Sequence, residues 1–380
     1  MIPATTFLAA ISGLIAPNMR PVSTGYSRVS YLCSVATPLK AVVVGAGPAG
    51  LASAWVLSER GFDVTVVERR SEPSPYEPQR AYLYLIDGRG QTFTDAARIT
   101  EKLASPAVSV SSANYTVTRI MPDSKRVTVT PPILEPMDPV LGRPSYWIPR
   151  ATLLSLFVDA LPSSVDMLYG CEVSEIRADD LGVEVVAKAA AGDDLRLRAD
   201  LLVGADGLNS AVRAKCAEWS GDDAGFTPVM LPSPSSGLAY KMLRFPASFK
   251  TAKDDPTAIA EARQAYSVRP AERAPEGQVR VPILDPTCFD PTCLDRTRDC
   301  THHTRDQVRL GILPVANPRF PRTANVILPP EHPVWKLNTT AAVRDWLSAT
   351  FPSLPIDEII DEAEAAECTP RWHHFAGTRL

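Results

Sequence analysis

The sequence predicts an α/β protein with a Rossmann-like domain built on a parallel sheet and an interleaved second domain built on an antiparallel or mixed β-sheet. Two observations lead to this prediction. Residues 40–68 read as strand, glycine-rich turn, helix and second strand, which is the start of a βαβ unit. Alternating apolar residues at 115–120 and 183–186 indicate antiparallel strands elsewhere in the chain.

Composition narrows the range of partners. The chain has 380 residues, 45% of them hydrophobic and 22% charged, with a formal net charge of −4. The hydrophobic and charged fractions predict a globular protein. The net charge shows no excess of basic residues of the kind that binds nucleic acid. No stretch reaches the roughly 18 apolar residues of a membrane-spanning helix, so we expect no transmembrane segment. The expected partner is a small-molecule substrate, and the oligomeric state stays open.

The cysteines predict neither a disulfide scaffold nor a metal site. Seven cysteines in 380 residues are sparse and odd in number, which favours a reducing compartment. Three of them gather with two histidines in a stretch rich in Pro and Asp. Their intervals do not match the close ligand pairs of zinc sites, so we expect a surface loop there. The cluster comprises Cys288, Cys293, Cys300, His302 and His303.

The N-terminal segment resembles a targeting leader. Residues 1–58 contain no Asp or Glu, and residues 1–39 are rich in Ser, Thr, Ala and Pro. An acid-poor, hydroxyl-rich leader is typical of an organellar transit peptide, so we expect a plastid or mitochondrial location and otherwise a cytoplasmic one. A signal-peptide core at residues 7–16 and a translation start at Met19 are the alternatives. Residues 1–39 are therefore left out of the predicted fold.

The glycines of the βαβ unit predict a dinucleotide site. Gly45 permits the tight turn after the strand at 41–44, Gly47 lets the backbone approach a pyrophosphate, and Gly50 allows close packing of the helix at 50–60. Glu68 ends the second strand, at 63–68, where a carboxylate accepts ribose hydroxyls. Because a carboxylate repels a 2′-phosphate, the site should hold FAD or NAD rather than NADP. Arg69 is a further candidate cofactor-binding residue.

A second motif discriminates between the two dinucleotides. Residues 198–213 read RADLLVGADGLNSAVR, with a buried strand at 201–203, a turn at 204–207 and a helix opening at 210–213. Taken alone, this pattern suggests a ligand site or a plain turn. Together with the glycine motif it resembles the flavin-dependent aromatic hydroxylases, the group that includes para-hydroxybenzoate hydroxylase. An NAD dehydrogenase is the weakest alternative, because it leaves this second motif unexplained.

The resemblance implies roles for particular residues. It places the ADP half of FAD at the glycine motif, and it places Asp206 and Gly207 beside the flavin. Arg150 matches an Arg with which the family opens the helix between the two motifs, and Arg80, in QRAYLYLIDGRGQ, resembles an Arg near the flavin. Both are candidate cofactor-binding residues. Residues 80–90, 238–246 and 309–330 are similar to segments of kynurenine 3-monooxygenase-like proteins.

The chemistry implied is that of an FAD-dependent monooxygenase. In the family, NAD(P)H reduces FAD, and a flavin hydroperoxide formed with O₂ hydroxylates a small aromatic or related substrate. The cofactor performs the oxygen chemistry, so no catalytic acid or base is named. Two alternatives remain: an isoprenoid-directed flavin reductase or epoxidase of the same fold, and a non-catalytic FAD-binding fragment. The second arises because the sequence reaches Leu380 before the family's third FAD motif, which leads us to expect a C-terminally truncated form.

The expected domains are discontinuous. The FAD-binding domain takes residues 40–100 and 145–220, and the substrate domain takes 101–144 and 221–370. Turn-rich segments at 131–144 and 232–237 mark the crossings. Residues 251–303 are long and polar, and we predict a loop insertion there.

Overall fold

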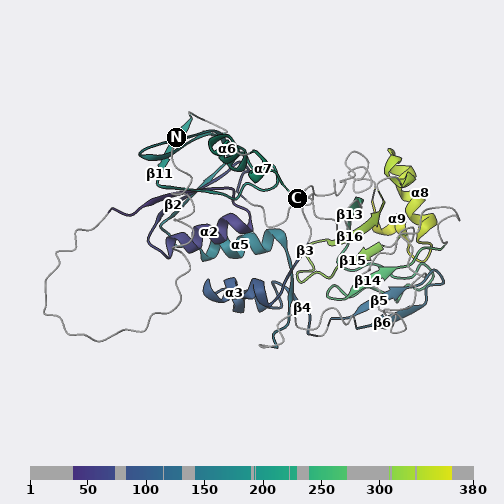
Figure 1. The fold of residues 1–380 in the computed structure, drawn as a ribbon. Helices are drawn as coiled ribbons and strands as arrows, with labels where there is room; N and C mark the ends of the chain where they lie inside the picture. The colour runs from purple at the N-terminus through teal and green to yellow at the C-terminus, as the bar shows by residue number, and fades with distance from the viewer. Residues whose placement is uncertain are drawn as a thin grey trace, which may run out of the picture. The chain divides into compact units, whose positions relative to one another are not determined.

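The computed structural model describes residues 37–72, 83–113, 115–130, 142–189, 192, 194–221, 223–228, 239–271, 308, 310–329 and 332–361. Residues 1–36 of the leader and the cluster of Cys288 to His303 lie outside these residues, as does Arg80. The organellar location therefore stays a prediction. The chain forms two compact units, Met1–Arg69 with Ser163–Thr227 and Arg70–Pro162 with Pro228–Leu380. Figure 1 shows the order of the elements along the chain.

The first unit contains the predicted parallel sheet. Four strands lie in the order β12-β1-β2-β8, and every neighbouring pair is parallel. Their bounds are β1 Lys40–Val44, β2 Asp63–Glu68, β8 Val165–Tyr169 and β12 Leu201–Gly204. The central strands are almost wholly buried, as expected for a parallel sheet covered on both faces. The strand, helix and strand predicted at 40–68 are thus confirmed.

Helix α2, Pro48–Ser58, follows β1 and begins two residues before the predicted start. Pro48 explains the difference, because proline has no N–H to lose and a fixed φ that suits the first helical position. Leu51, Ala54 and Leu57 are the buried side of the helix. Helices α6, Ala211–Ser220, and α7, Asp223–Phe226, follow β12.

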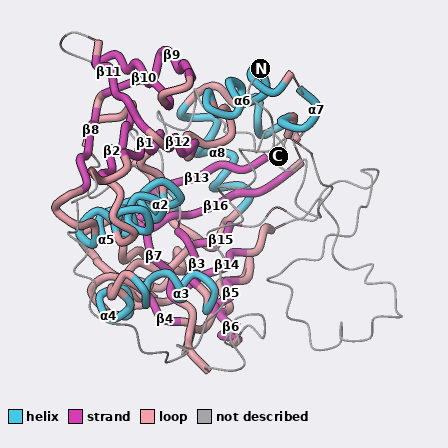
Figure 2. The backbone as a smooth tube through the Cα atoms, turned by 60° about the vertical axis from the view of Figure 1, so that its left-hand side comes forward, coloured by secondary structure: helices cyan, strands magenta, loops and turns pink. Residues whose placement is uncertain are grey.

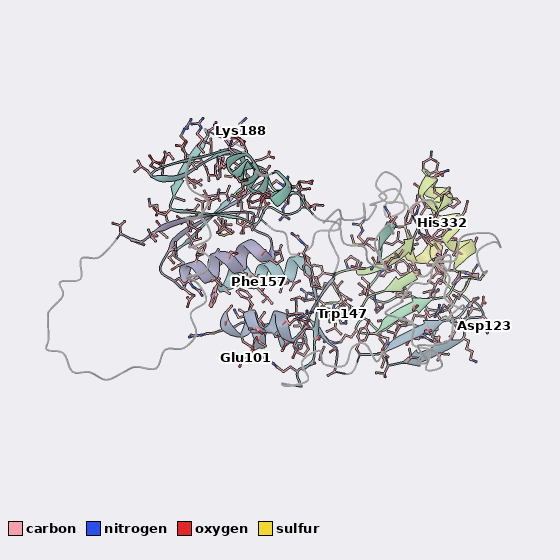
Figure 3. All side chains as sticks on the ribbon, in the orientation of Figure 1. Glu101, Asp123, Trp147, Phe157, Lys188 and His332 are labelled. Carbon is pink, nitrogen blue, oxygen red and sulfur yellow. The ribbon has the colours of Figure 1, made fainter. Side chains whose placement is uncertain are left out.

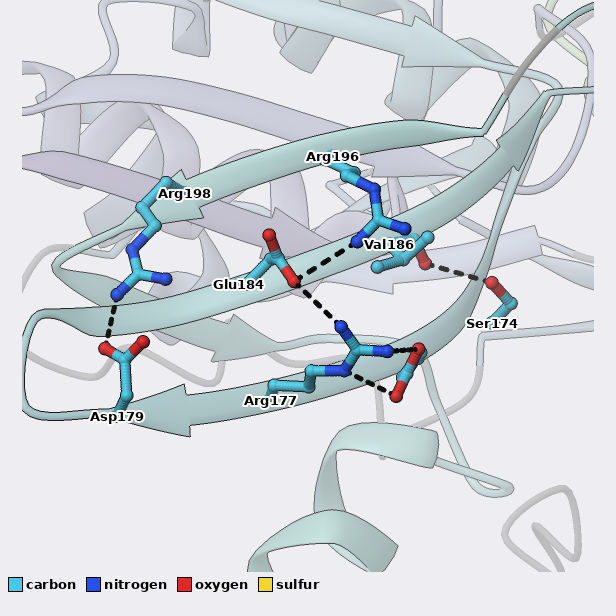
Figure 4. Close-up of polar contacts among 8 residues, drawn as sticks. Ser174, Arg177, Asp179, Glu184, Val186, Arg196 and Arg198 are labelled. Carbon is cyan, nitrogen blue, oxygen red and sulfur yellow. Dashed lines mark hydrogen bonds and ion pairs between the residues drawn. The ribbon is translucent and has the colours of Figure 1, made fainter.

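A three-stranded antiparallel sheet completes the first unit. It comprises β9 Cys171–Asp179, β10 Gly182–Ala189 and β11 Leu195–Ala199, in the order β11-β10-β9. One face packs on β1 and β2 through an apolar core that includes Val42, Val67 and Val185. The other face carries paired charges (Figure 4), where Arg177 contacts Glu175 at 2.6 Å and Glu184 at 3.4 Å. Such exposed ion pairs contribute little to stability.

The second unit contains a small antiparallel sheet, and three helices are neighbours of its strands along the sequence. Its strands are β3 Leu83–Ile86, β7 Tyr146–Pro149 and β4 Val110–Ser111, in the order β3-β7-β4. The helices are α3 Gly88–Ala96, α4 Thr100–Ala104 and α5 Arg150–Ala160. Phe157 of α5, which Figure 3 labels, packs edge-on against Phe93 of α3, with ring centroids 5.0 Å apart.

The second unit also contains a six-stranded mixed sheet, ordered β13-β16-β15-β14-β5-β6. These strands run side by side in Figures 1 and 2. Only β14 and β5 pair in parallel, while the other neighbours are antiparallel. The bounds are β5 Val117–Ile120, β6 Arg126–Val129, β13 Ala239–Phe245, β14 Ala265–Val268, β15 Leu310–Ile312 and β16 Arg322–Leu328.

One face of this sheet is buried against the second unit's main core. The core continues into the 3₁₀ helix η4 Pro333–Lys336 and the helices α8 Thr340–Thr350 and α9 Ile356–Ile359. Strand residues Leu243, Val326 and Ile312 meet helical residues Val343 and Leu347 in this core. An α/β fold with a separate mixed sheet is therefore the observed fold class, as predicted.

Two boundary predictions differ from the structure. β14 lies inside residues 251–303, so the predicted loop insertion is wrong for residues 265–268. The strand has only four residues and follows a polar run, which hides its alternation in the sequence. In addition, residues 70–100 and 145–162 belong to the second compact unit rather than the first. The predicted boundaries rest on turn-rich segments in the sequence, whereas the units follow the packing of the chain itself.

Arg322 is a buried cation at the start of β16. Its residue is 1% exposed, and burial lowers the pKa of its guanidinium to about 10. The guanidinium lies 5.1 Å from the centroid of the Tyr266 ring and 5.6 Å from that of Phe249. It donates hydrogen bonds to four backbone carbonyls, those of Ala247, Glu261, Gln264 and Leu313. Arg322 therefore connects several loops at this end of strand β16.

Candidate functional site

The candidate site lies where the glycine turn joins β1 to α2 in the first unit. Gly45 has a φ of +102°, which L side chains rarely adopt, and a Cβ there would lie 2.5 Å from the carbonyl oxygen of Ala205. A Cβ on Gly50 would lie 1.8 Å from the carbonyl oxygen of Gly45. Both positions therefore require glycine because the protein's own backbone passes so close.

Gly47 differs from its two neighbours in the motif. Its φ of −74° and ψ of 177° suit any residue, and a Cβ built there meets nothing within 4 Å. The fold itself does not require a glycine at this position. Open space beside the backbone is what a pyrophosphate needs in order to approach the turn.

The N-terminus of α2 adjoins this open space. Gly47 is its N-cap and makes no side-chain capping hydrogen bond, and Pro48 occupies the first helical position. The first backbone bond of the helix runs from the N–H of Leu51 to the carbonyl of Gly47. Amide groups of the first turn and the positive end of the helix dipole are thus directed toward a site suited to an anion.

Glu68 lies at the carboxyl end of β2 and is 6% exposed. One oxygen of its carboxylate accepts a hydrogen bond from the N–H of Ala46, at 2.8 Å. This contact fixes the turn against β2, as does the 2.8 Å bond from the N–H of Gly45 to the carbonyl of Val67. A carboxylate has acceptor positions beyond one hydrogen bond, so the same group suits ribose hydroxyls.

The second motif packs directly on the first. The N–H of Ala205 donates to the carbonyl of Val44 at 2.8 Å, and the Ala205 methyl would lie 3.3 Å from a Cβ on Gly50. Gly207 has a positive φ of 85° in the turn that follows. The sequence analysis did not single out Ala205, although its small side chain directly after Gly204 was the available signal.

Asp206 caps helix α6. Its carboxylate accepts hydrogen bonds from the hydroxyl of Ser210 at 2.6 Å and from the N–H groups of Ala211 at 2.6 Å and Val212 at 3.3 Å. Ser210, the N-cap, accepts from the N–H of Arg213 at 2.9 Å. The first-turn amides of α6 are therefore occupied by the chain's own side chains, in contrast to those of α2.

The structure thus brings Gly45, Gly47, Gly50, Glu68, Asp206 and Gly207 together in the first unit. Arg69 follows Glu68 directly and is exposed. Arg150 is the first residue of α5 in the second unit and is 6% exposed. The described residues contain no group of three or more His, Cys, Asp or Glu side chains placed to hold a metal ion. Within those residues, no helix has the length and apolarity to cross a membrane.

This arrangement defines a dinucleotide-binding α/β protein. Comparison of the sequence with known families narrows the class: the family described as "FAD binding domain" matches residues 39–236, more than half of the chain. The chain belongs to this family. The residues present fit FAD, because the open space at Gly47, the uncapped α2 N-terminus and the buried Glu68 provide for its pyrophosphate and ribose.

Curated relatives match about half of the chain. The FAD-dependent monooxygenase ausM of Emericella nidulans is 28% identical over 189 residues, which are 50% of this chain and 37% of the relative. The 3-amino-4-hydroxybenzoate 2-monooxygenase of Streptomyces cremeus is 29% identical over 192 residues, which are 50% of this chain and 44% of the relative. The matched stretches therefore span less than half of each relative's length.

Two solved structures share the fold. The flavin-dependent monooxygenase PieE, in complex with FAD and substrate, has a TM-score of 0.52 and 17% identity, and the match covers 83% of this chain and 47% of PieE. Aklavinone-11 hydroxylase, in a ternary complex with FAD and aklavinone, has a TM-score of 0.51 and 18% identity, covering 83% and 50%. At these identities the likeness is one of fold alone.

Replacing Asp206 with Ala should separate capping from direct contact with the cofactor. Loss of the α6 cap should destabilise the flavin-free protein by about 1–2 kcal/mol. Urea denaturation of flavin-free protein measures this change, and Asp206→Asn should lose less because its amide oxygen still accepts. An unchanged denaturation midpoint together with lost FAD binding would show that Asp206 acts on the cofactor and not on the helix.

Proposed function

We propose that this chain is a flavin-dependent monooxygenase that hydroxylates a small aromatic or related substrate with O₂ and NAD(P)H. The observation that carries the proposal is the match of its FAD-binding half to curated proteins named as FAD-dependent monooxygenases. The finer part of the proposal is a likeness to kynurenine 3-monooxygenase-like proteins. It rests on the sequence resemblance of residues 80–90, 238–246 and 309–330.

Bound FAD would supply the electron transfer and oxygen chemistry. The chain's own residues hold and orient it. The open turn at Gly47 and the amides of α2 take the pyrophosphate, and the carboxylate of Glu68 takes ribose hydroxyls. Ala205 holds the turn in shape from the other side, since it packs against both Gly45 and Gly50. Binding and positioning are therefore the protein's contribution at this site.

Isotope labelling tests the proposed reaction. The purified full chain is loaded with FAD and supplied with NADH or NADPH, ¹⁸O₂ and a panel of aromatic acids and isoprenoids. We expect at least one aromatic compound to accelerate NAD(P)H oxidation and to gain one ¹⁸O atom per molecule, measured by mass spectrometry.

The other outcomes identify the alternatives. Labelling of an isoprenoid instead of an aromatic compound would favour an epoxidase, and NAD(P)H-dependent reduction of an isoprenoid without label would favour a reductase. A folded, FAD-loaded protein that oxidises no NAD(P)H with any compound would contradict the proposal. That result would favour a non-catalytic FAD-binding protein.

A further inference from the structure

A cavity of about 280 Å³ lies in the second unit and is lined in part by helix α9. Its other walls come from Ile259 and from residues of the segment 246–250, which follows strand β13. None of the residues assigned to FAD lines this cavity. It is therefore a separate feature from the flavin site described above.

Backbone hydrogen bonds hold the walls of the cavity in place. The N–H of Ala260 donates to the carbonyl of Phe249 at 2.8 Å, which fixes residue 259 beside the segment that follows β13. The N–H of Lys253 donates to the carbonyl of Ser353 at 2.8 Å, which ties the same loop to the segment before α9. The cavity is thus formed without a ligand, as most small-molecule sites are.

Most of the lining is apolar. Phe249 and Ile359 are 5% and 6% exposed and belong to the second unit's main core, while Pro246 and Ile259 are exposed to solvent. Such a lining stabilises an apolar group by removing it from water. The volume lies just below the range of about 300–1,000 Å³ that is usual for ligand pockets, so the cavity suits a small molecule.

Two opposite charges line the same cavity. The Nζ atom of Lys250 lies 2.7 Å from a carboxylate oxygen of Glu358, and the two side chains are 36% and 58% exposed. An exposed ion pair of this kind contributes little to stability. A ligand that brings both a carboxylate and an ammonium group can therefore replace this contact at small cost, whereas a ligand with one charge leaves either Lys250 or Glu358 without a partner.

We propose that this cavity binds a free α-amino acid with an apolar side chain. The carboxylate of the amino acid pairs with Lys250, its ammonium group pairs with Glu358, and its side chain lies against Phe249 and Ile359. Both charges of an α-amino acid are carried next to one carbon atom, which suits two protein charges that lie in contact with each other. The inference is independent of the proposed function, because it involves neither FAD nor oxygen.

Calorimetric titration of the purified full chain tests the inference. Leucine is compared with isoamylamine, which lacks the carboxylate, with isocaproate, which lacks the ammonium group, and with glycine, which lacks the apolar side chain. We expect each singly charged analogue to bind about threefold more weakly than leucine, because partly exposed ion pairs have modest strength. Glycine should bind at least about tenfold more weakly, because it buries no apolar side chain.

Substitutions of the two charged residues assign the contacts. Lys250→Met should bind leucine no more tightly than isoamylamine, and Glu358→Gln should bind it no more tightly than isocaproate. Lys215→Met is the matched control, because Lys215 lies 2.8 Å from the carboxylate of Glu218 on helix α6 and does not line the cavity. The control should keep the preference of the wild type for leucine over both analogues.

Ser248→Trp provides a steric test. An indole at the wall of the cavity should weaken leucine binding at least about tenfold, while circular dichroism shows the native spectrum. The inference is overturned if the wild type binds leucine no more tightly than glycine and the two analogues, or if the preferences survive both Lys250→Met and Glu358→Gln. It is also overturned if leucine does not bind and sedimentation shows self-association that Ser248→Trp abolishes, because a second copy of the chain would then occupy the cavity.

Discussion

Gly47→Val should weaken FAD binding by about a hundredfold or more, which corresponds to about 2.7 kcal/mol, and should leave the flavin-free protein equally stable. The fold leaves open space at Gly47, and its backbone angles suit valine. The added side chain therefore takes space from the pyrophosphate and from no group of the protein. Titration of FAD into the variant, followed by flavin fluorescence, measures the affinity.

Gly50→Ala is the matched comparison for Gly47→Val. Its Cβ would lie 1.8 Å from the carbonyl oxygen of Gly45, so the turn must move and the flavin-free protein itself must be destabilised. Urea denaturation of the two flavin-free variants separates these effects. Gly47→Val with wild-type FAD affinity, in a folded protein, would show that the cofactor does not bind against this turn.

Arg322→Met should destabilise the second unit by about 2–4 kcal/mol. The change removes the donor to four backbone carbonyls, three of them on half-buried residues and one on the exposed Glu261. A buried polar group left without a partner costs about 1–3 kcal/mol. Part of this loss is offset, because the variant no longer buries a positive charge that lacks a carboxylate partner. The net effect remains destabilising because methionine donates no hydrogen bond, so the loops lose the donor that they share.

Urea denaturation followed by tryptophan fluorescence measures this effect, since Trp335 and Trp346 pack against the second unit's main core. Arg177→Met is the matched control, because Arg177 is an exposed arginine of the first unit with two carboxylate partners (Figure 4). We expect the control to keep the wild-type denaturation midpoint. A midpoint for Arg322→Met equal to that of the control would contradict the role assigned to Arg322.

The sequence carried enough information to predict the first βαβ unit almost to the residue. Its strand, turn, helix and second strand are local patterns within about thirty residues, and three spaced glycines on a strand-to-helix turn mark the motif in the sequence itself. The same holds for the strand and turn that contain Asp206. Helix α2 begins early because proline serves as a start signal.

The rest depends on contacts between distant residues. β5 and β14 pair in parallel although Val117 and Ala265 are far apart in sequence, and no local pattern announces this pairing. Which side chains share one face of the six-stranded sheet is decided only once its strands are paired in register. The sequence also did not reveal that Asp206 caps helix α6, because its motif is as typical of a ligand site as of a helix N-terminus. Local propensity therefore predicts the elements, and tertiary pairing decides which side chains share a site.

Equilibrium titration of FAD into the purified full chain tests the central claim most directly. The claim is that the Gly47 turn, Glu68 and the α2 N-terminus form a flavin site. We expect a yellow protein with one FAD per chain, and a Glu68→Ala variant with markedly weaker binding. A protein that is folded by circular dichroism yet retains no flavin at saturating FAD would contradict the account.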